Sequence, residues 1–146
     1  MTTETEHRAL FTDARDLSAI PNQSIDLVVT SPPYPMIEMW NHVFADLDPE
    51  ADPTVSGADA WKRMHGVLDG VWRECCRVLK PGSFACVNVG DATRSIGDNF
   101  RLYTNHARVT EICEGLGFHS LPPILWRKQT NAPTKFMGSG MLPAGA

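Results

Sequence analysis

The sequence predicts an α/β fold in which a partly wound sheet carries helices on its faces. Three observations lead to this class. An apolar, β-branched run at residues 25–29 is followed by two prolines, an amphipathic pattern fills residues 60–80, and a second apolar run at residues 83–89 follows a Pro-Gly pair. Strand and helix patterns that alternate in this way are typical of α/β domains. With 146 residues the chain can bury one modest core, so we expect a single domain or part of one.

The predicted first strand is short, apolar and too rich in β-branched side chains for a stable helix; it contains Ile25, Leu27, Val28 and Val29. Pro32 and Pro33 come next, fix φ at two successive residues and remove two backbone donors. We therefore expect a stiff turn whose carbonyl oxygens are not used by a helix or a sheet. The carboxyl ends of strands are where open α/β sheets bind their ligands.

Two segments after this turn have compositions that predict their placement. Residues 35–42 are apolar and aromatic, so we expect a helix beside the turn, with Trp40 either lining a pocket or packing into the core. Residues 45–59 are rich in Asp, Pro and Gly and cannot bury much surface, so we expect an acidic surface loop there.

The clearest helix is predicted at residues 60–80. Its apolar side chains recur at three- and four-residue steps and form one stripe: Trp61, Met64, Leu68, Val71, Trp72, Cys75 and Leu79. Pro81 and Gly82 are expected to end this helix. Residues 83–89 are predicted to be a second strand, which ends at Gly90 and Asp91.

The rest of the chain continues the alternation. Residues 92–100 are predicted to be a polar connection, and the apolar residues between Leu102 and Leu116 predict a second amphipathic helix. Residues 119–128 are predicted to be extended, at a sheet edge or in a bent strand, because Pro122 and Pro123 lack donors. Residues 129–146 are predicted to be a Gly- and Pro-rich loop.

The composition disfavours several classes of protein. Its hydrophobic fraction of 42% and charged fraction of 21% are ordinary for a globular protein, and no apolar run is long enough to cross a bilayer, so we expect a cytoplasmic protein. The spacing of the four cysteines fits neither a zinc site nor a disulfide framework, so we expect core thiols and no metal. The net charge of −4 disfavours extensive phosphate contacts, although Arg and Lys residues gather after residue 90 and can form a local basic face.

The turn Ser31-Pro32-Pro33-Tyr34 has the groups needed to methylate an exocyclic amino group of a nucleobase. The lone pair of such a nitrogen is delocalised into the ring, so the nitrogen attacks poorly unless acceptors take its hydrogens and let it pyramidalise. The Ser31 hydroxyl and the Pro32 carbonyl can both accept from one amino group, and Tyr34 can stack on a base turned out of its helix. A plain strand-ending turn, or a proline-rich peptide bound by a partner, is the alternative.

Residues 26–34, Asp-Leu-Val-Val-Thr-Ser-Pro-Pro-Tyr, resemble the strand and loop of the amino-group DNA methyltransferases, which make N4-methylcytosine or N6-methyladenine with S-adenosylmethionine. Residues 77–87 are similar to a helix-turn-strand unit of many methyltransferases. The resemblance implies a partial Rossmann-like, S-adenosylmethionine-dependent methyltransferase sheet. It also implies double-stranded DNA with a flipped target base as substrate, and a cognate restriction endonuclease as partner.

The resemblance further implies roles for single residues. Ser31 is similar to the first motif residue of the cytosine-N4 enzymes, so N4 of cytosine is the expected target and N6 of adenine the alternative. Pro33 is expected to keep the turn rigid. Asp91 is expected either to position the substrate or to cap a turn. Asp13 follows Thr12, where the family often has a Gly-Asp pair near the cofactor, so it is a candidate for cofactor contact or a turn residue.

The glycine-rich cofactor segment of the family has one candidate in this sequence, Gly138-Ser139-Gly140. No apolar strand precedes it and Pro143 interrupts any following helix, so we expect a loop there. In one branch of the family the catalytic loop precedes the cofactor segment. We therefore expect residues 1–146 to be an incomplete catalytic segment that alone binds S-adenosylmethionine weakly or not at all. The alternative is an inactive fragment, or a subunit that needs a partner carrying the cofactor half.

Overall fold

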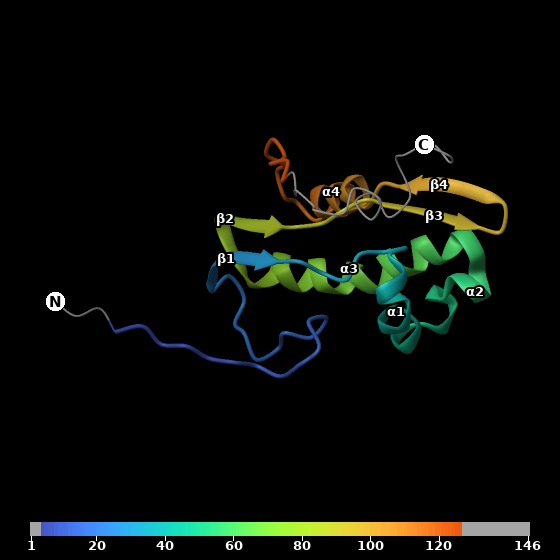
Figure 1. Cartoon of the computed structure of the whole chain (residues 1–146). Helices are drawn as coiled ribbons and strands as arrows, with labels where there is room; N and C mark the ends of the chain where they lie inside the picture. Colours follow the sequence, from blue (N-terminus) through green and yellow to red (C-terminus); the bar gives the residue numbers. More distant parts are fainter. Residues whose placement is uncertain (1–3, 127–146) are drawn as a thin grey trace.

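The computed structural model describes residues 4–126, in which strands and short helices surround one long helix (Figure 1). The elements in chain order are β1 (Ile25–Thr30), the 3-10 helix η1 (Glu38–Trp40), α1 (Asn41–Leu47), the 3-10 helix η2 (Pro49–Ala51), α2 (Pro53–Ser56), the 3-10 helix η3 (Gly57–Asp59), α3 (Ala60–Val78), β2 (Leu79–Val87), β3 (Ala92–Ile96), β4 (Asn99–Tyr103) and α4 (Asn105–Gly115).

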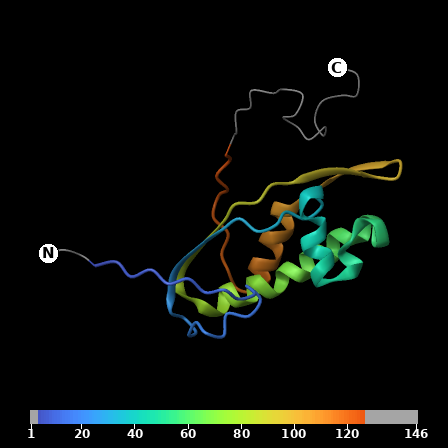
Figure 2. The ribbon, with the colours of Figure 1, turned by 60° about the horizontal axis from the view of Figure 1, so that its bottom comes forward.

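Strands β1 and β2 form a parallel pair that α3 connects. Leu27 lies opposite Phe84, and Val29 lies opposite Cys86. Two parallel neighbours require a crossover connection, which α3 supplies (Figures 1 and 2). Helix α4 packs against α3. This unit confirms the predicted α/β class and the partial Rossmann-like sheet.

Helix α3 confirms the predicted apolar stripe. One face of the helix is buried, because apolar positions recur at the helical period. The buried residues of α3 are Ala60, Met64, His65, Leu68, Trp72, Cys75 and Val78. Most of them belong to the hydrophobic core, which also takes in Met36, Phe44, Tyr103 and Val109 from other elements.

The predicted end of this helix was wrong. Helix α3 ends at Val78 rather than at residue 80, and Leu79 is already extended, with φ −71° and ψ 138°. Pro81 and Gly82 lie within β2, where a register shift in the pairing with β1 accommodates the extra residues. Gly82 has φ +81°, which glycine adopts without steric cost, so the Pro-Gly pair shapes an irregular strand start instead of stopping the helix.

Residues 92–100, expected to be a polar connection, lie largely in an antiparallel hairpin. Strands β3 and β4 pair with Ile96 opposite Asn99, so Gly97 and Asp98 form a two-residue turn. Gly97 has φ +58°, which suits the tight turns of hairpins. The hairpin projects from the rest of the chain in Figure 2, and its apolar residues Phe100 and Leu102 are exposed rather than part of a buried face. The second helix begins at Asn105 instead of Leu102 because Leu102 belongs to β4.

The expectation of an acidic loop at residues 45–59 was also wrong. This segment contains the end of α1, then η2, α2 and η3. The Asp48 side chain accepts a hydrogen bond from the amide of Glu50 at 3.0 Å, and Asp52 accepts from the amide of Thr54 at 2.8 Å. Each Asp is the N-cap residue and is followed by a proline at the first helical position, so Asp48-Pro49 begins η2 and Asp52-Pro53 begins α2.

The run predicted to be an extended strand at residues 119–128 forms neither strand nor helix as far as residue 126, where the described part of the chain ends. Pro122 and Pro123 have no N–H to donate to a sheet. The predicted loop at residues 129–146 and the glycine pair in it lie outside the described residues. Within residues 4–126, no helix is long and apolar enough to span a membrane.

Candidate active site

The turn after β1 stands at the carboxyl end of the parallel strand pair. The Asn88 amide donates to the Thr30 carbonyl at 2.8 Å, so the two strands stay joined up to the turn. Ser31 is exposed, Pro32 is buried and Pro33 is half-buried. The turn is therefore anchored by Pro32 while it presents Ser31 to solvent.

Ser31 and Tyr34 are joined by a hydrogen bond. Ser31 Oγ lies 3.0 Å from the Tyr34 hydroxyl, and either atom can donate. The structure thus brings together the two side chains that the sequence predicted as one site. Because the intervening prolines fix φ, this pair sits on a stiff segment.

The Tyr34 ring lies against Gly90, which follows β2. A Cβ atom at Gly90 would be 3.3 Å from Tyr34 Cε2 and 3.5 Å from Cδ2, so any side chain at this position would crowd one edge of the ring. A larger residue at position 90 would force the ring to move by a few tenths of an ångström, so glycine suits this close approach. The ends of β1 and β2 therefore meet through this contact.

The chain reverses directly after Tyr34 in a β-turn. The Ile37 amide donates to the Tyr34 carbonyl at 3.2 Å, with Pro35 and Met36 as the central residues. Met36 has φ +66°, as a type II turn requires at this position, where glycine is usual. Such a conformation costs a larger residue roughly 1–2 kcal/mol. Met36 is buried and its amide donates to Met64 Sδ at 3.2 Å, so core packing and this contact offset the strain.

Asn105, the first residue of α4, is a polar residue of the core that sequence reasoning missed. It is 0% exposed. Its Nδ2 donates to the Pro35 carbonyl at 2.9 Å and to the Gly90 carbonyl at 3.0 Å. In the sequence, an Asn that follows Thr at a helix start is expected only as a cap, so no local signal revealed these contacts.

Asp91 follows Gly90 and accepts a hydrogen bond from the first turn of α4, although it lies far from that helix in the sequence. Its carboxylate accepts from the His106 amide at 3.1 Å and lies 2.8 Å from His106 Nδ1. The Asp91 side chain is 27% exposed, so part of it faces solvent at the same end of the strand pair as Tyr34.

The other two predicted residues lie in different settings. Trp40 ends η1, is half-buried and packs against the hydrophobic core. Asp13 is exposed and forms an ion pair with Arg15 at 2.6 Å. Hydrogen bonds from the Arg15 side chain and amide lower the pKa of Asp13 to about 2. No hydrogen bond among the described residues joins Asp13 to residues 31–34.

Groups of three or more His, Cys, Asp or Glu side chains that could hold a metal are absent from residues 4–126. The four cysteines are free: Cys75, Cys76, Cys86 and Cys113. Burial raises the pKa of Cys113 to about 11 and also raises that of Cys75, so these two remain protonated thiols at neutral pH and are poor nucleophiles.

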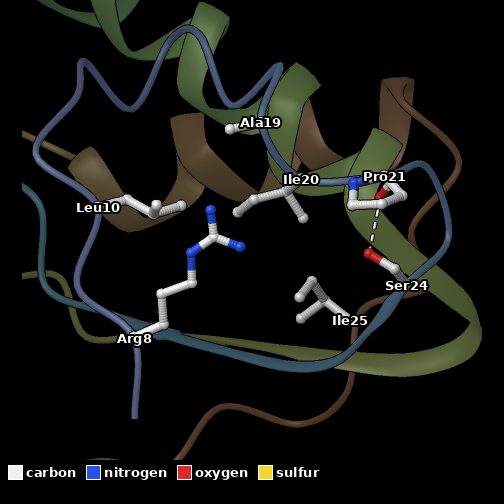
Figure 3. A pocket seen from close by; sticks show the side chains of 7 residues that line it. All are labelled: Arg8, Leu10, Ala19, Ile20, Pro21, Ser24 and Ile25. Carbon is white, nitrogen blue, oxygen red and sulfur yellow. Dashed lines mark hydrogen bonds between the residues drawn. The ribbon is translucent and has the colours of Figure 1, made fainter.

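A cavity of about 310 Å³ lies at the opposite, amino end of β1 (Figure 3). Figure 3 shows Arg8 extending among otherwise mostly apolar side chains that include Leu10, Ile20 and Ile25. Ser24 also lines it, but its hydroxyl donates to the Pro21 carbonyl at 2.7 Å. The cavity therefore lies apart from the Ser31–Tyr34 turn and does not contain the predicted site residues.

Comparisons with known proteins show the family of this chain. Residues 25–141 match a family model for N6/N4 methyltransferases, described as DNA methylase. The chain is 47% identical over 147 residues to the type II methyltransferase M.MthZI of Methanothermobacter thermautotrophicus, across 98% of this chain and 41% of that protein. It is 46% identical over 156 residues to the type II methyltransferase M.MjaI of Methanocaldococcus jannaschii, across 97% of this chain and 52% of that protein. The chain thus spans about half the length of these relatives.

Solved structures show the same likeness. TTHA0409, a candidate DNA modification methylase from Thermus thermophilus, aligns with a TM-score of 0.61 and 32% identity over 84% of this chain and 45% of that one. Its complex with S-adenosyl-L-methionine aligns with a TM-score of 0.61 and 34% identity over 82% of this chain and 44% of that one. The family match covers the turn and both strands of the parallel pair, and with it this chain belongs to the DNA methylase family of N6/N4 amino-methyltransferases.

Proposed function

We propose that the enzyme built on this chain transfers a methyl group from S-adenosylmethionine to an exocyclic amino group in double-stranded DNA, at N4 of cytosine. One observation carries the proposal: a hydroxyl pair, Ser31 and Tyr34, sits on a proline-stiffened turn at the carboxyl end of β1. Membership of the DNA methylase family supports the reaction class. Ser31 favours cytosine, and N6 of adenine is the alternative target.

The acceptors of the target amino group are proposed to be Ser31 Oγ and the Pro32 carbonyl. A hydroxyl oxygen has two lone pairs, so Ser31 Oγ can still accept one hydrogen whichever way the bond to Tyr34 runs. No described residue donates a hydrogen bond to the Pro32 carbonyl. Two acceptors on one rigid turn localise the lone pair on the nitrogen. With the methyl donor bound, the new N–C bond would form as the methyl–sulfur bond breaks and leaves a thioether, and the nitrogen would lose a proton to solvent or to Ser31.

Tyr34 is proposed to stack on the flipped base, with Pro33 keeping the turn rigid. Tyr34 is only half-buried, so part of its side chain is accessible to a base. Asp91 follows Gly90, so we propose that it positions the substrate, and we propose Trp40 as a wall of the base pocket. Flipping the base brings it to the turn, which cannot reach a base inside a duplex.

S-adenosylmethionine supplies an electrophilic methyl group on sulfur when it is bound. The described residues do not fit a complete site for it. No glycine-rich turn joins a strand to a helix within residues 4–126, and Asp13, the predicted contact, is paired with Arg15. We therefore propose that polypeptide outside residues 4–126 completes the cofactor site. The isolated chain is expected to bind S-adenosylmethionine weakly or not at all, and tight stoichiometric binding in calorimetry would contradict this.

The outer face of the β1–β2 pair is the proposed docking surface for the polypeptide that completes this site. Leu27, Val29 and Phe84 are 53%, 72% and 57% exposed, and Cys86 is exposed beside Val29. Cross-strand neighbours thus form one apolar patch on a strand pair whose other side packs against the core. The relatives M.MthZI and M.MjaI contain roughly as much further chain as this one, which is enough to cover the patch.

The proposed function is tested by identifying the product. The enzyme that contains this chain and its cofactor segment is incubated with unmethylated DNA and isotopically labelled S-adenosylmethionine, and the DNA is digested to nucleosides. N4-methylcytosine is the expected product. N6-methyladenine would assign the alternative target, and the absence of labelled nucleoside would refute DNA amino-methylation. A cognate restriction endonuclease is the proposed partner, and protection of DNA from it follows the same modification.

A further inference from the structure

We propose that Asn105 is a positioning residue for methyl transfer, which holds the Ser31–Tyr34 turn in register with Gly90. The inference rests on the proposed function, which supplies the reaction. The positioning itself is argued from hydrogen bonds in the core. Asn105 lies outside the Ser31–Tyr34 turn, and it acts through Tyr34 rather than on the substrate.

The amide of Asn105 has every hydrogen-bonding position occupied. Two donors of Nδ2 reach the carbonyls of Pro35 and Gly90 at 2.9 and 3.0 Å. Oδ1 accepts from Trp61 Nε1 at 2.8 Å and lies 3.2 Å from His65 Nε2. An asparagine amide offers two donors and two acceptor positions, so the group is saturated.

These partners also fix the orientation of the amide. The indole Nε1 of Trp61 can only donate, so the atom that faces it must be the oxygen Oδ1. The NH2 group therefore faces the two carbonyls. His65 donates from Nε2, which makes Nδ1 the unprotonated nitrogen, and this buried Nδ1 has no hydrogen-bond partner among the described residues. Helix α3 thus orients Asn105, and Asn105 in turn holds the turn.

The carbonyls of Pro35 and Gly90 belong to the two segments that meet where the Tyr34 ring lies against Gly90. Pro35 directly follows Tyr34 and belongs to the turn with Met36, whereas Gly90 supports the edge of the Tyr34 ring. One NH2 group that holds both carbonyls therefore sets the distance between the tyrosine and its support. A shift of about 1 Å in a positioned reacting group can reduce a rate by about a hundredfold.

The test uses a substitution that removes both donors and places a buried carboxyl group against the two carbonyls, so the double-mutant cycle below separates positioning from the cost of that group. N105D keeps the size of the side chain and the acceptors for Trp61 and His65, but it replaces the NH2 group by an oxygen. W61F is the matched control, because it removes a bond from the same network and leaves both bonds to Pro35 and Gly90. If Asn105 positions the turn, N105D lowers kcat by about 10 to 100-fold, whereas KM for DNA stays within about threefold and W61F keeps most of the kcat.

A double-mutant cycle separates positioning from general damage. If Asn105 acts through Tyr34, N105D has little further effect on kcat in a Y34A background, since residues that share one interaction are not additive. Equal effects of N105D in the wild-type and Y34A backgrounds would overturn the proposal.

Amide hydrogen exchange on the full chain supplies a readout that does not depend on activity. The Ile37 amide, which closes the turn on Tyr34, should exchange about tenfold faster in N105D than in W61F, because a buried carbonyl loses its donor. Equal exchange in the two variants overturns the positioning role. Faster exchange in N105D together with a wild-type enzyme that does not modify DNA would refute the proposed function and leave the structural clamp standing.

Discussion

The two ends of β1 are both held by a polar side chain from a helix, but the chemistry of the two attachments differs. At the amino end, Arg77 of α3 donates to the carbonyls of Leu17 and Ile20 at 2.8 and 3.0 Å. Its guanidinium also pairs with Glu74 at 2.7 Å. The Arg77 side chain is 29% exposed, so this attachment is ionic and partly solvated.

At the carboxyl end, the attachment is a neutral amide inside the core. Asn105 is fully buried and donates to Pro35 and Gly90. Burying a charge there would carry a desolvation penalty that only a well-placed partner could offset. The comparison teaches that the clamp on the turn with the proposed chemistry is a neutral buried amide, whereas the clamp at the other end is a partly solvated ion pair.

The largest expected effect is on kcat, and it is tested by replacing one serine at each end of β1. S31A should lower kcat by about 10² to 10³-fold, by analogy with the loss of one preorganised polar contact to a reacting group. S24A removes the hydroxyl before β1, which donates to Pro21, and should leave kcat within about twofold. Steady-state methylation kinetics of both variants in the complete enzyme check this. Equal losses in S31A and S24A would show that the two ends do not differ in function.

The next effect is a loss of stability on acidification that arises at the buried attachment. Burial lowers the pKa of His65 to about 4, from 6.5 for the free side chain. The unfolded chain therefore binds a proton between these values and the folded chain does not, so stability falls as pH drops from 6.5 to about 4. The loss approaches about 3 kcal/mol. Denaturant unfolding at several pH values measures it, and H65Q, which keeps a donor for Asn105, should remove this dependence. A wild-type stability that is flat from pH 6.5 to 4 would contradict the account.

Two exposed phenylalanines test whether the outer face of the β1–β2 pair, which lies between the two ends, is the docking surface. Phe84 lies on β2 and is 57% exposed, and Phe100 lies on β4 and is 53% exposed. F84K should weaken association with the polypeptide that carries the cofactor site by roughly tenfold or more, since a buried Phe contributes about 1.5–3 kcal/mol. F100K should change it little. Affinity between the separately expressed parts measures both, and a stronger effect of F100K would place the docking surface on the hairpin.

The smallest effect concerns the ionic attachment. Hydrogen bonds from the Arg77 side chain, and then from the Leu17 amide, lower the pKa of Glu74 to about 2, from 4.5. A depressed acid pKa stabilises the folded state above pH 4.5, and this contribution is lost as pH falls toward 2. The protection factor of the Leu17 amide, which donates to Glu74 at 2.7 Å, should fall over this lower range relative to the intrinsic exchange rate at each pH. In E74Q the protection factor should be low at every pH, and protection that persists in E74Q would contradict the assignment.

The parts of the fold that the sequence predicted correctly are those with local signals. The β-branched run of β1 ends at adjacent prolines, and the buried stripe of α3 repeats at helical steps, so neighbouring residues suffice. The motif also indicated that Ser31 and Tyr34 lie near one another on a stiff turn, but the hydrogen bond between their hydroxyls is known only from the structure.

The parts that could not be predicted depend on distant partners or on polar patterns. Asn105 bonds Pro35, 70 positions away, and Trp61, 44 positions away, so no spacing rule reveals it. Strands β3 and β4 contain few buried side chains, and their hairpin is signalled only by the Gly97-Asp98 turn. Capping by Asp48 turned an acidic segment into helical turns, because composition alone does not show which acids bond to the backbone.

The most direct test of the account removes both hydroxyl-bearing groups of the turn at once. The complete enzyme, with Ser31→Ala and Tyr34→Ala together, is expressed in a host that lacks amino-methylation, and modified nucleosides in the host DNA are counted beside those made by the wild type. We predict N4-methylcytosine with the wild type and a loss of at least about a hundredfold with the double variant. Undiminished modification by the double variant would contradict the central claim that this turn prepares the amino nitrogen for methyl transfer.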